Sequence, residues 1–516
     1  MTMRMCWFVS VVLIFGAALG NAQDVSVPVE RYVFLKHHGV SKYGERAFTA
    51  EQQLVPAAIE ATEEVRVKIH GVWIDRSDVM SVSETIKHYT TQLESEPSNV
   101  TSLLRRGMAY QLADQFSSAI QDYSAVIKID GGNAKAYECR GVTRFTRASK
   151  YPATSEATDL DAAISDLGAA IRLAPTDNRA LIERGNLRRY MKDFDASLRD
   201  YTKGIRLNPS EPLAYFWRAK SLEAKGESEA ALQDYSRAIS IDGSSTLFLV
   251  GRGNLLRSMK NYEDAIEDYD KAIGLDSTCT KAFFHRAAAF QMAEKCDAAI
   301  ADYTTVIRQD PPAVDAIRNR AVVFTACGQL DNAIDDFNAA VRIDPSNAEV
   351  FYLRGKVHGQ QKRYAAAIED FTESLRLDGT LAQSYRTRGL VYQKLGKYEN
   401  AVRDFSEFIR LKPTNHWILN ELALIYATCP EESVRDGAKG VDLAKRACAA
   451  SNWKNPGYIE TLAAAYSQAS DWENAVSNQE KALQMAGTES EKINRRNRLS
   501  LYQRKETLQV PQPKME

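Results

Sequence analysis

The sequence predicts an all-α array of about eleven helix-turn-helix repeats that follows a small β domain. The prediction depends on a 34-residue period in which small and aromatic residues return at fixed positions. In the period that begins at Thr246, for example, Leu249, Gly253 and Leu256 are separated by four and three residues. This spacing places them on one helical face, and a second triplet in the same period behaves alike. One period therefore folds as two amphipathic helices joined by a tight turn.

The length and charge of the chain limit what kind of protein it is. At 516 residues the chain is too long for one globular core, so several domains or a repeat array are expected. Its 66 Lys and Arg residues are balanced by 67 Asp and Glu residues. Because proteins that bind nucleic acid usually carry an excess of positive charge, we do not expect a nucleic-acid partner.

Seven consecutive periods run from residue 178 to residue 415 without insertion or deletion. Position 8 of each period is small, which lets two helix backbones approach, and position 24 is aromatic, which fills the space beside them. The position-8 residues are Gly185, Ala219, Gly253, Ala287, Ala321, Gly355 and Gly389. The position-24 residues are Tyr201, Tyr235, Tyr269, Tyr303, Phe337, Phe371 and Phe405.

Two further repeats precede these, so that nine repeats span residues 100–415. The second of the nine fits if about ten extra residues, the run around ASKYPATSEATD, are looped out between its helices. Prolines such as Pro209, Pro345 and Pro413 follow second helices. Since proline cannot continue a helix, it turns the chain into the next repeat.

This pattern resembles the tetratricopeptide repeat (TPR), whose helix-turn-helix units stack into a right-handed superhelix with a concave groove. The resemblance covers about residues 81–489. Residues 416–489 are expected to form two divergent repeats, and ATCP, RDG and GYIETLAAAY within them resemble the terminal module of a family of exported bacterial TPR proteins. Residues 490–507 are expected to form a capping helix, which hides the last apolar face of the array, and residues 508–516 a flexible tail. The arginines of the capping helix could alternatively bind an anionic surface.

The N-terminal region differs in kind. Residues 81–98 resemble the second helix of a repeat, with Ser81 and Glu84 as a capping box. Within residues 23–80, alternating apolar residues on either side of a His-Gly turn predict a β-hairpin, and RYVFLK predicts another strand. The segment VRVKIHGVWIDRSDVM resembles the closing strands of a bacterial SH3-like barrel.

Residues 1–22 read as an export signal. MTMRM supplies a positive charge, CWFVSVVLIFGAALG an apolar core, and GNA a small-residue cleavage site. The apolar run is short for a bilayer-spanning anchor, which is the alternative, and no later segment could span a membrane. The mature protein is therefore expected to be periplasmic or secreted. Six cysteines follow the signal; they are either small core residues or oxidised, and Cys296 and Cys327 are the pair to test first.

Position 7 is Arg and position 23 is Asp in all nine regular repeats, whereas both are lost in the two divergent ones. This joint loss predicts an ion pair with a facing helix of the same or the neighbouring repeat, because the planar fork of Arg can hold a carboxylate by two hydrogen bonds. An arginine stripe that captures an anionic ligand is the alternative. In the seven uninterrupted repeats the arginines are Arg184, Arg218, Arg252, Arg286, Arg320, Arg354 and Arg388, and the aspartates are Asp200, Asp234, Asp268, Asp302, Asp336, Asp370 and Asp404.

We find no signature of catalysis in the sequence. It contains no P-loop, HExxH or GxSxG motif, and GRGNLL lacks the third glycine of a dinucleotide-binding loop. His37 and His38 are adjacent, as in many solvated loops. We therefore expect no catalytic residue, no metal site and no cofactor.

In TPR proteins the ligand commonly lies in the groove lined by positions 2, 5, 6, 9, 12 and 13 of the first helices. The resemblance thus implies a non-enzymatic, exported adaptor that binds protein or peptide through aromatic, cationic and amide side chains. The alternative is a structural or assembly scaffold of the cell envelope, which acts through its convex face, termini or β domain. The implied groove residues are Arg179, Asn186, Arg189, Tyr190, Phe216, Trp217, Lys220, Asn254, Arg257, Phe284, His285, Arg318, Asn319, Tyr352, Lys356 and Arg386.

Overall fold

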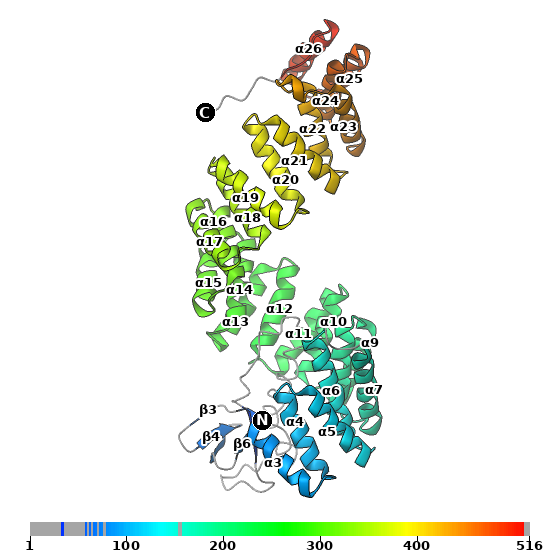
Figure 1. Cartoon of the computed structure of the whole chain (residues 1–516), viewed down its shortest axis with the longest axis vertical. Helices are drawn as coiled ribbons and strands as arrows, with labels where there is room; N and C mark the ends of the chain where they lie inside the picture. The colour runs from blue at the N-terminus through cyan, green and yellow to red at the C-terminus, as the bar shows by residue number, and fades with distance from the viewer. Residues whose placement is uncertain are drawn as a thin grey trace. The chain divides into compact units, whose positions relative to one another are not determined.

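The computed structural model describes residues 32–35, 57–58, 61–62, 66–69, 72–75, 79–152 and 157–509 (Figure 1). The chain divides into two compact halves, residues 1–276 and 277–516, and each half is described by itself. The predicted export signal, residues 1–22, and most of the predicted tail lie outside the described residues.

The N-terminal half begins with six short strands in two antiparallel three-stranded sheets, ordered β2-β1-β6 and β3-β4-β5. The predicted hairpin is confirmed, since Val67 of β4 lies opposite Ile74 of β5, and RYVFLK contributes β1. The predicted SH3-like fold stays a prediction, because much of residues 23–80 is outside the described part. The strands are β1 Tyr32–Leu35, β2 Ala57–Ala58, β3 Ala61–Thr62, β4 Arg66–Ile69, β5 Val72–Asp75 and β6 Val79–Ser81.

Among the described residues of the N-terminal half, the strands are followed by helices, and each pair packs on the next in chain order. The first helix has the predicted capping box of Ser81 and Glu84. The helices are α3 Val82–Ser95, α4 Val100–Leu112, α5 Phe116–Ile129, α6 Ala134–Lys150, α7 Ala157–Leu173, α8 Arg179–Tyr190, α9 Phe194–Leu207, α10 Pro212–Ala224, α11 Ser228–Ile241, α12 Thr246–Ser258 and α13 Tyr262–Leu275.

The C-terminal half continues the same pairing and ends in a single helix, α26. Across the described residues the 24 α-helices comprise eleven pairs flanked by α3 and α26. The helices of this half are α14 Thr280–Met292, α15 Cys296–Gln309, α16 Val314–Ala326, α17 Leu330–Ile343, α18 Ala348–Gln360, α19 Tyr364–Leu377, α20 Ala382–Lys394, α21 Tyr398–Leu411, α22 His416–Thr428, α23 Gly437–Ala450, α24 Pro456–Gln468, α25 Trp472–Gln484 and α26 Glu489–Gln503.

The insertion in the second repeat differs from the predicted loop. Its residues mostly lengthen the two helices, so that α6 and α7 have 17 residues each where α8 has 12. An ion pair of 2.7 Å between Arg147 and Asp159 joins the two added turns. This pair, together with the helix-forming Ala and Lys residues of the run, explains why the segment is largely helical.

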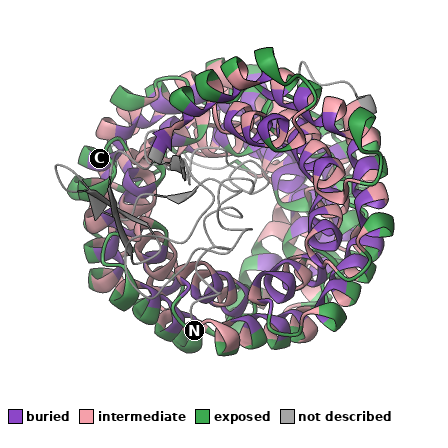
Figure 2. Cartoon of the chain, turned by 90° about the horizontal axis from the view of Figure 1, so that it is seen from below, coloured by how far each residue is buried: buried purple, intermediate pink, exposed green. Residues whose placement is uncertain are grey.

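The small residues of position 8 lie directly against the rings of position 24. A Cβ atom added to Gly185 would lie 2.6 Å from Cε1 of Tyr201, and one added to Gly253 would lie 2.7 Å from Cε1 of Tyr269. Both tyrosines are fully buried. Helices of the array carry buried residues on one side and exposed residues on the other (Figure 2).

The nine arginines of position 7 each form an ion pair with the aspartate of their own repeat, at 2.6–2.7 Å. The aspartate is the more buried partner; for example, the side chain of Asp268 is 2% exposed and that of Arg252 is 22% exposed. In the tenth repeat, Leu422 and Leu443 occupy the two positions, and both are buried.

The same arginines also reach the preceding second helix, which the sequence analysis did not predict. In seven repeats the remaining guanidinium nitrogen, Nη1, donates to a small polar side chain at position 25 of the repeat before. The acceptors are Thr90, Ser124, Thr202, Ser236, Thr304, Asn338 and Thr372. Each such arginine therefore joins one repeat to its neighbour.

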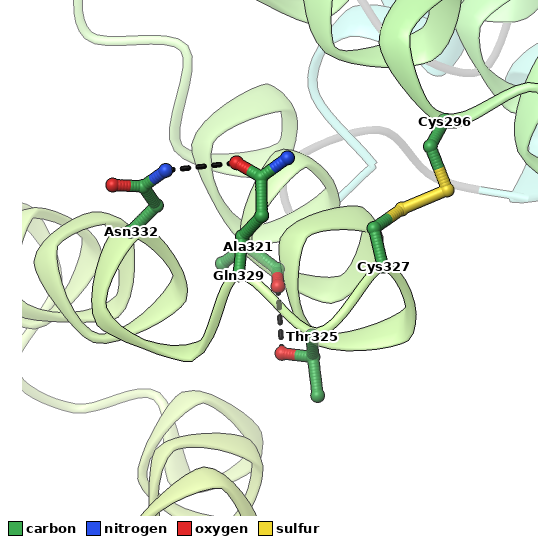
Figure 3. The surroundings of a disulfide bond; sticks show 6 residues. All are labelled: Cys296, Ala321, Thr325, Cys327, Gln329 and Asn332. Atoms are coloured by element: carbon green, nitrogen blue, oxygen red, sulfur yellow. Dashed lines mark hydrogen bonds between the residues drawn. A yellow bond between two sulfur atoms is a disulfide. The ribbon is translucent and has the colours of Figure 1, made fainter.

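A disulfide bond links Cys296 and Cys327, whose Cα atoms are 6.4 Å apart (Figure 3). Cys296 begins α15, the second helix of the sixth repeat, and Cys327 caps the end of α16, the first helix of the seventh. The bond thus connects two consecutive repeats. Cys139, Cys429 and Cys448 are buried thiols, as expected for small core residues.

Candidate functional site

Three of the implied groove residues of the N-terminal half are buried and do not line an open groove. Asn186 is 0% exposed, and Phe216 and Trp217 are each 1% exposed. Phe216 packs edge-on against Trp217 and Tyr235, and a Cβ atom at Gly251 would lie 2.8 Å from its ring. The ring of Phe216 therefore packs beside α12, and that of Trp217 lies against Arg189 of α8, instead of facing solvent.

Other implied groove residues of this half are engaged in contacts within the array. Arg179 pairs with Asp177 at 2.8 Å, and Lys220 pairs with Glu223 at 3.0 Å. The guanidinium of Arg189 lies 4.7 Å from the ring centre of Trp217.

Two tyrosines at position 24 contact further implied groove residues. The hydroxyl of Tyr269 donates to Asn254, at 2.8 Å, and also interacts with Arg257. The hydroxyl of Tyr201 donates to Asn186 in the same way, at 2.7 Å. These amides therefore orient rings of the core, while Tyr190, at 38% exposure, faces solvent.

In the C-terminal half the implied residues are more accessible. Arg318 pairs with Asp315 at 3.2 Å and with Glu349 at 3.3 Å, and Asn319 lies beside it. The ammonium of Lys356, an exposed residue, lies 5.7 Å from the ring centre of Tyr352.

The remaining implied residues of this half are half-buried. Phe284 contacts the rings of His285 and Tyr303, with ring centres 5.7 and 5.5 Å apart. Arg386 lies on α20, and its Nε is buried.

A cleft of about 450 Å³ opens on the first-helix side of the last two repeats, between α22, α24 and α26. Positions 2, 5, 6 and 9 of both first helices contribute to its wall, and Arg498 of α26 and Leu508 close one side. The first-helix residues at these positions are Trp417, Asn420, Glu421 and Leu424 of α22, and Gly457, Glu460, Thr461 and Ala464 of α24.

Asn420 is the most informative residue of this cleft. It is 8% exposed, and its side-chain oxygen, Oδ1, has no hydrogen-bond partner within the described part of the chain. A buried amide oxygen without a partner costs about 1–3 kcal/mol, so the site is suited to a ligand that brings an N–H group. Trp417 is 39% exposed at the rim, where an apolar side chain could cover it.

The walls of the cleft are held in place by polar contacts. Glu460 accepts hydrogen bonds from Arg495, at 2.6 Å, and from Arg498. Two arginines of the capping helix thus serve this internal contact, whereas the exposed Arg496 and Arg504 pair with Glu489 and Glu506. Burial raises the pKa of the neighbouring Glu421, against the opposing effect of a hydrogen bond from Gln393.

The sequence analysis did not name these cleft residues, although the signal was present. The divergent repeats keep the spacing of the regular ones, so positions 2, 5, 6 and 9 could have been assigned to α22 and α24.

The described residues contain neither a cluster of metal-binding side chains nor a helix suited to cross a membrane. Within that part of the chain, His, Cys, Asp and Glu side chains do not gather into groups of three that could hold a metal ion. None of the described helices combines the length and the apolar character needed to cross a membrane.

Comparison with known proteins agrees with the helical pairs. Models described as tetratricopeptide repeat match residues 182–246, 247–279, 348–380 and 382–415, and one described as TPR repeat matches residues 321–362. Mitochondrial import receptor subunit TOM34 of Rattus norvegicus is 39% identical over 66 residues, and that of Mus musculus 38%. These matches span 13% of this chain and 21% of the relatives' length.

Solved structures that match parts of the chain include YrrB, described as a TPR protein with an unusual peptide-binding site, and yeast Tom70. YrrB is 21% identical, with 36% of this chain and 97% of that chain covered and a TM-score of 0.32. Tom70 is 13% identical, with 82% of this chain and 92% of that chain covered and a TM-score of 0.35. The repeat-model matches show that residues 182–279, 321–380 and 382–415 contain tetratricopeptide repeats, and the helical pairs in the described residues agree with them.

Proposed function

We propose that this chain is a non-enzymatic, exported adaptor that binds an extended peptide segment of a partner protein on its first-helix side. The cleft between α22, α24 and α26 is the main contact in this proposal. The observation that carries it is Asn420, which lines the cleft and whose buried Oδ1 has no hydrogen-bond partner among the described residues.

An extended peptide supplies what the cleft requires. Its backbone N–H groups can donate to Asn420, and one of its apolar side chains can cover the exposed ring of Trp417. Aromatic side chains that become buried against a partner commonly supply much of the affinity in protein complexes. Tyr352 and Lys356, together with Arg318, lie at corresponding first-helix positions of earlier repeats and extend the candidate surface in the same half.

Export is the second part of the proposal. Residues 1–22 have the charge, the apolar core and the small-residue cleavage site of a signal peptide. The disulfide between Cys296 and Cys327 supports the same location, since such bonds persist in oxidising compartments. N-terminal sequencing of the mature protein should give a start near Gln23; a chain that keeps its first residues would contradict export by cleavage.

Binding can be tested with a random-peptide array and the full chain. Peptides selected by the wild type should bind the Asn420→Leu and Trp417→Ala variants at least about tenfold more weakly, because each substitution removes a central contact. Glu373→Gln, on the second helix α19, is the matched control and should bind like the wild type. Equal binding by all four proteins would favour a scaffold whose first-helix side holds no specific ligand.

The structure also indicates which groove cations to reverse. Lys356→Glu changes an exposed residue and should alter binding without loss of the fold. Arg189 and Lys220 contact Trp217 and Glu223, so charge reversal at these two positions would disturb the array as well as the groove.

A further inference from the structure

A second pocket, of about 550 Å³, lies on the second-helix side of the tenth repeat, between α21, α22 and α23. It is separate from the peptide cleft, which lies on the first-helix side. The residues that line it include Ser406 and Ile409 of α21, Leu422 and Tyr426 of α22, and Asp442 and Leu443 of α23.

The ninth repeat shows what normally fills this place. There Arg388 donates to Asp404 of its own repeat and to Thr372 of the repeat before, and its guanidinium lies 5.9 Å from the ring centre of Tyr392. The arginine side chain thus occupies the space bounded by positions 23, 25 and 11.

The tenth repeat keeps several of the side chains that surround this arginine, but it has no arginine at position 7. Leu422 and Leu443 stand at the positions of Arg388 and Asp404, whereas Ser406 retains the hydroxyl of Thr372 and Tyr426 the ring of Tyr392. A carboxylate is present as well, because Asp442 precedes Leu443 and its side chain is 69% exposed. We propose that this pocket accepts an arginine side chain from a partner protein.

The chemistry of the pocket fits a guanidinium on a short aliphatic stem. Ile409, Leu422 and Leu443 are buried and apolar, so they can pack against the methylene groups. The Ser406 hydroxyl donates to the carbonyl of Val402, at 2.7 Å, which leaves lone pairs to accept from the guanidinium, as Thr372 accepts from Arg388.

Two contacts inside the pocket compete with the incoming side chain. The ammonium of Lys439 lies 5.6 Å from the ring centre of Tyr426, but it also pairs with Asp436 at 3.1 Å and can stay there. Arg446 pairs with Asp442 at 3.5 Å, and both groups of this pair are largely exposed. An exposed pair of this kind contributes at most about 1 kcal/mol, so a guanidinium seated in the pocket can displace it.

The test uses the full chain and the blocked tripeptide acetyl-Gly-Arg-Gly-amide, followed by the methyl NMR signals of Leu422 and Leu443. These signals should shift saturably with the arginine peptide. The citrulline peptide, which has a similar shape and no charge, should bind at least about tenfold more weakly. Asp442→Asn should weaken binding of the arginine peptide about fivefold or more. Glu407→Gln, which alters an exposed pair elsewhere on α21, is the control and should leave binding unchanged.

A double variant, Leu422→Arg with Leu443→Asp, provides the complementary test. It should form the internal pair of the regular repeats, fill the pocket and abolish the shift of the Ile409 methyl signal with the peptide. Equal saturation with the arginine and citrulline peptides would overturn the proposal in favour of a purely apolar contact. A lack of saturable shifts up to the solubility limit would overturn it altogether.

Discussion

Arg252 holds Asp268 by two parallel hydrogen bonds, from Nε to Oδ2 at 2.8 Å and from Nη2 to Oδ1 at 2.6 Å. Its third nitrogen, Nη1, donates to Ser236 of the preceding repeat at 3.1 Å. One side chain therefore fixes the two helices of its own repeat and the junction with the repeat before. This arrangement, repeated along the chain, explains why Arg and Asp occur together and are lost together.

A double-mutant cycle should show strong coupling between these two residues. Arg252→Leu leaves the buried carboxylate of Asp268 without its partner and should lower the free energy of unfolding by about 2–3 kcal/mol. Arg252→Leu combined with Asp268→Leu imitates the tenth repeat and should cost clearly less than the sum of the two single variants. Urea unfolding followed by circular dichroism measures each value, and a coupling energy near zero would contradict the pairing.

The junction between repeats can be tested separately. Ser236→Ala removes the acceptor of Nη1 and leaves the Arg252–Asp268 pair intact, so it should cost about 0.5–1.5 kcal/mol. Hydrogen exchange should become faster in both α11 and α12, because the lost bond joins them. Faster exchange in α12 alone would show that the bond does not couple the two repeats.

Position 8 should tolerate a methyl group poorly where the ring is closest. Gly185→Ala places a Cβ atom 2.6 Å from Tyr201, and the buried ring must move, at a cost of about 1–3 kcal/mol. Gly274→Ala is the matched control, since a Cβ atom there meets nothing within 4 Å. The control should be neutral or more stable by up to about 1 kcal/mol, because Ala favours a helix over Gly. Equal thermal stability of the two variants would refute this role of position 8.

The sequence was sufficient to predict the helical pairs, because the same small and aromatic positions recur in nine repeats with a 34-residue period. It could not indicate that Nη1 of seven of these arginines reaches the previous repeat, since position 25 varies among Ser, Thr, Asn, Gly and Asp and resembles an ordinary exposed position. The groove positions of the TPR family also predicted that Phe216 and Trp217 face the groove, whereas both side chains are buried in the core. A ring at those positions is long enough to reach the neighbouring first helix, and the period alone does not encode that distance.

Glu183 should make the stability of the N-terminal half depend on pH. Burial, and secondly the nearby Glu138 carboxylate, raise the pKa of Glu183 to about 8, and its Oε2 has no hydrogen-bond partner among the residues that the structure describes. A carboxyl group with a raised pKa in the folded state favours folding below its unfolded pKa, and this contribution is lost as the pH rises through the folded value. Unfolding free energy should therefore fall by about 1–3 kcal/mol between pH 6 and pH 9. The free energy of unfolding of Glu183→Gln, which cannot ionise at this position, should fall less over the same pH range. Parallel curves of unfolding free energy against pH for the variant and the wild type would contradict the assignment.

The disulfide should stabilise the junction between the sixth and seventh repeats. The bond joins residues that are 31 positions apart in the sequence. Breaking it should lower the free energy of unfolding by about 2–4 kcal/mol, because the unfolded segment regains conformational freedom. Cys296→Ala combined with Cys327→Ala should speed hydrogen exchange in α15 and α16 and leave α24 and α25 unchanged, since each repeat contacts only its neighbours. Burial raises the pKa of the Cys139 and Cys448 thiols to about 11, so iodoacetamide at pH 8 should label these two slowly both in the wild type and in the variant. Faster exchange throughout the C-terminal half would instead mean that the bond stabilises the whole half cooperatively. Unchanged exchange in α15 and α16 would mean that the packing of these helices holds the junction together without the disulfide.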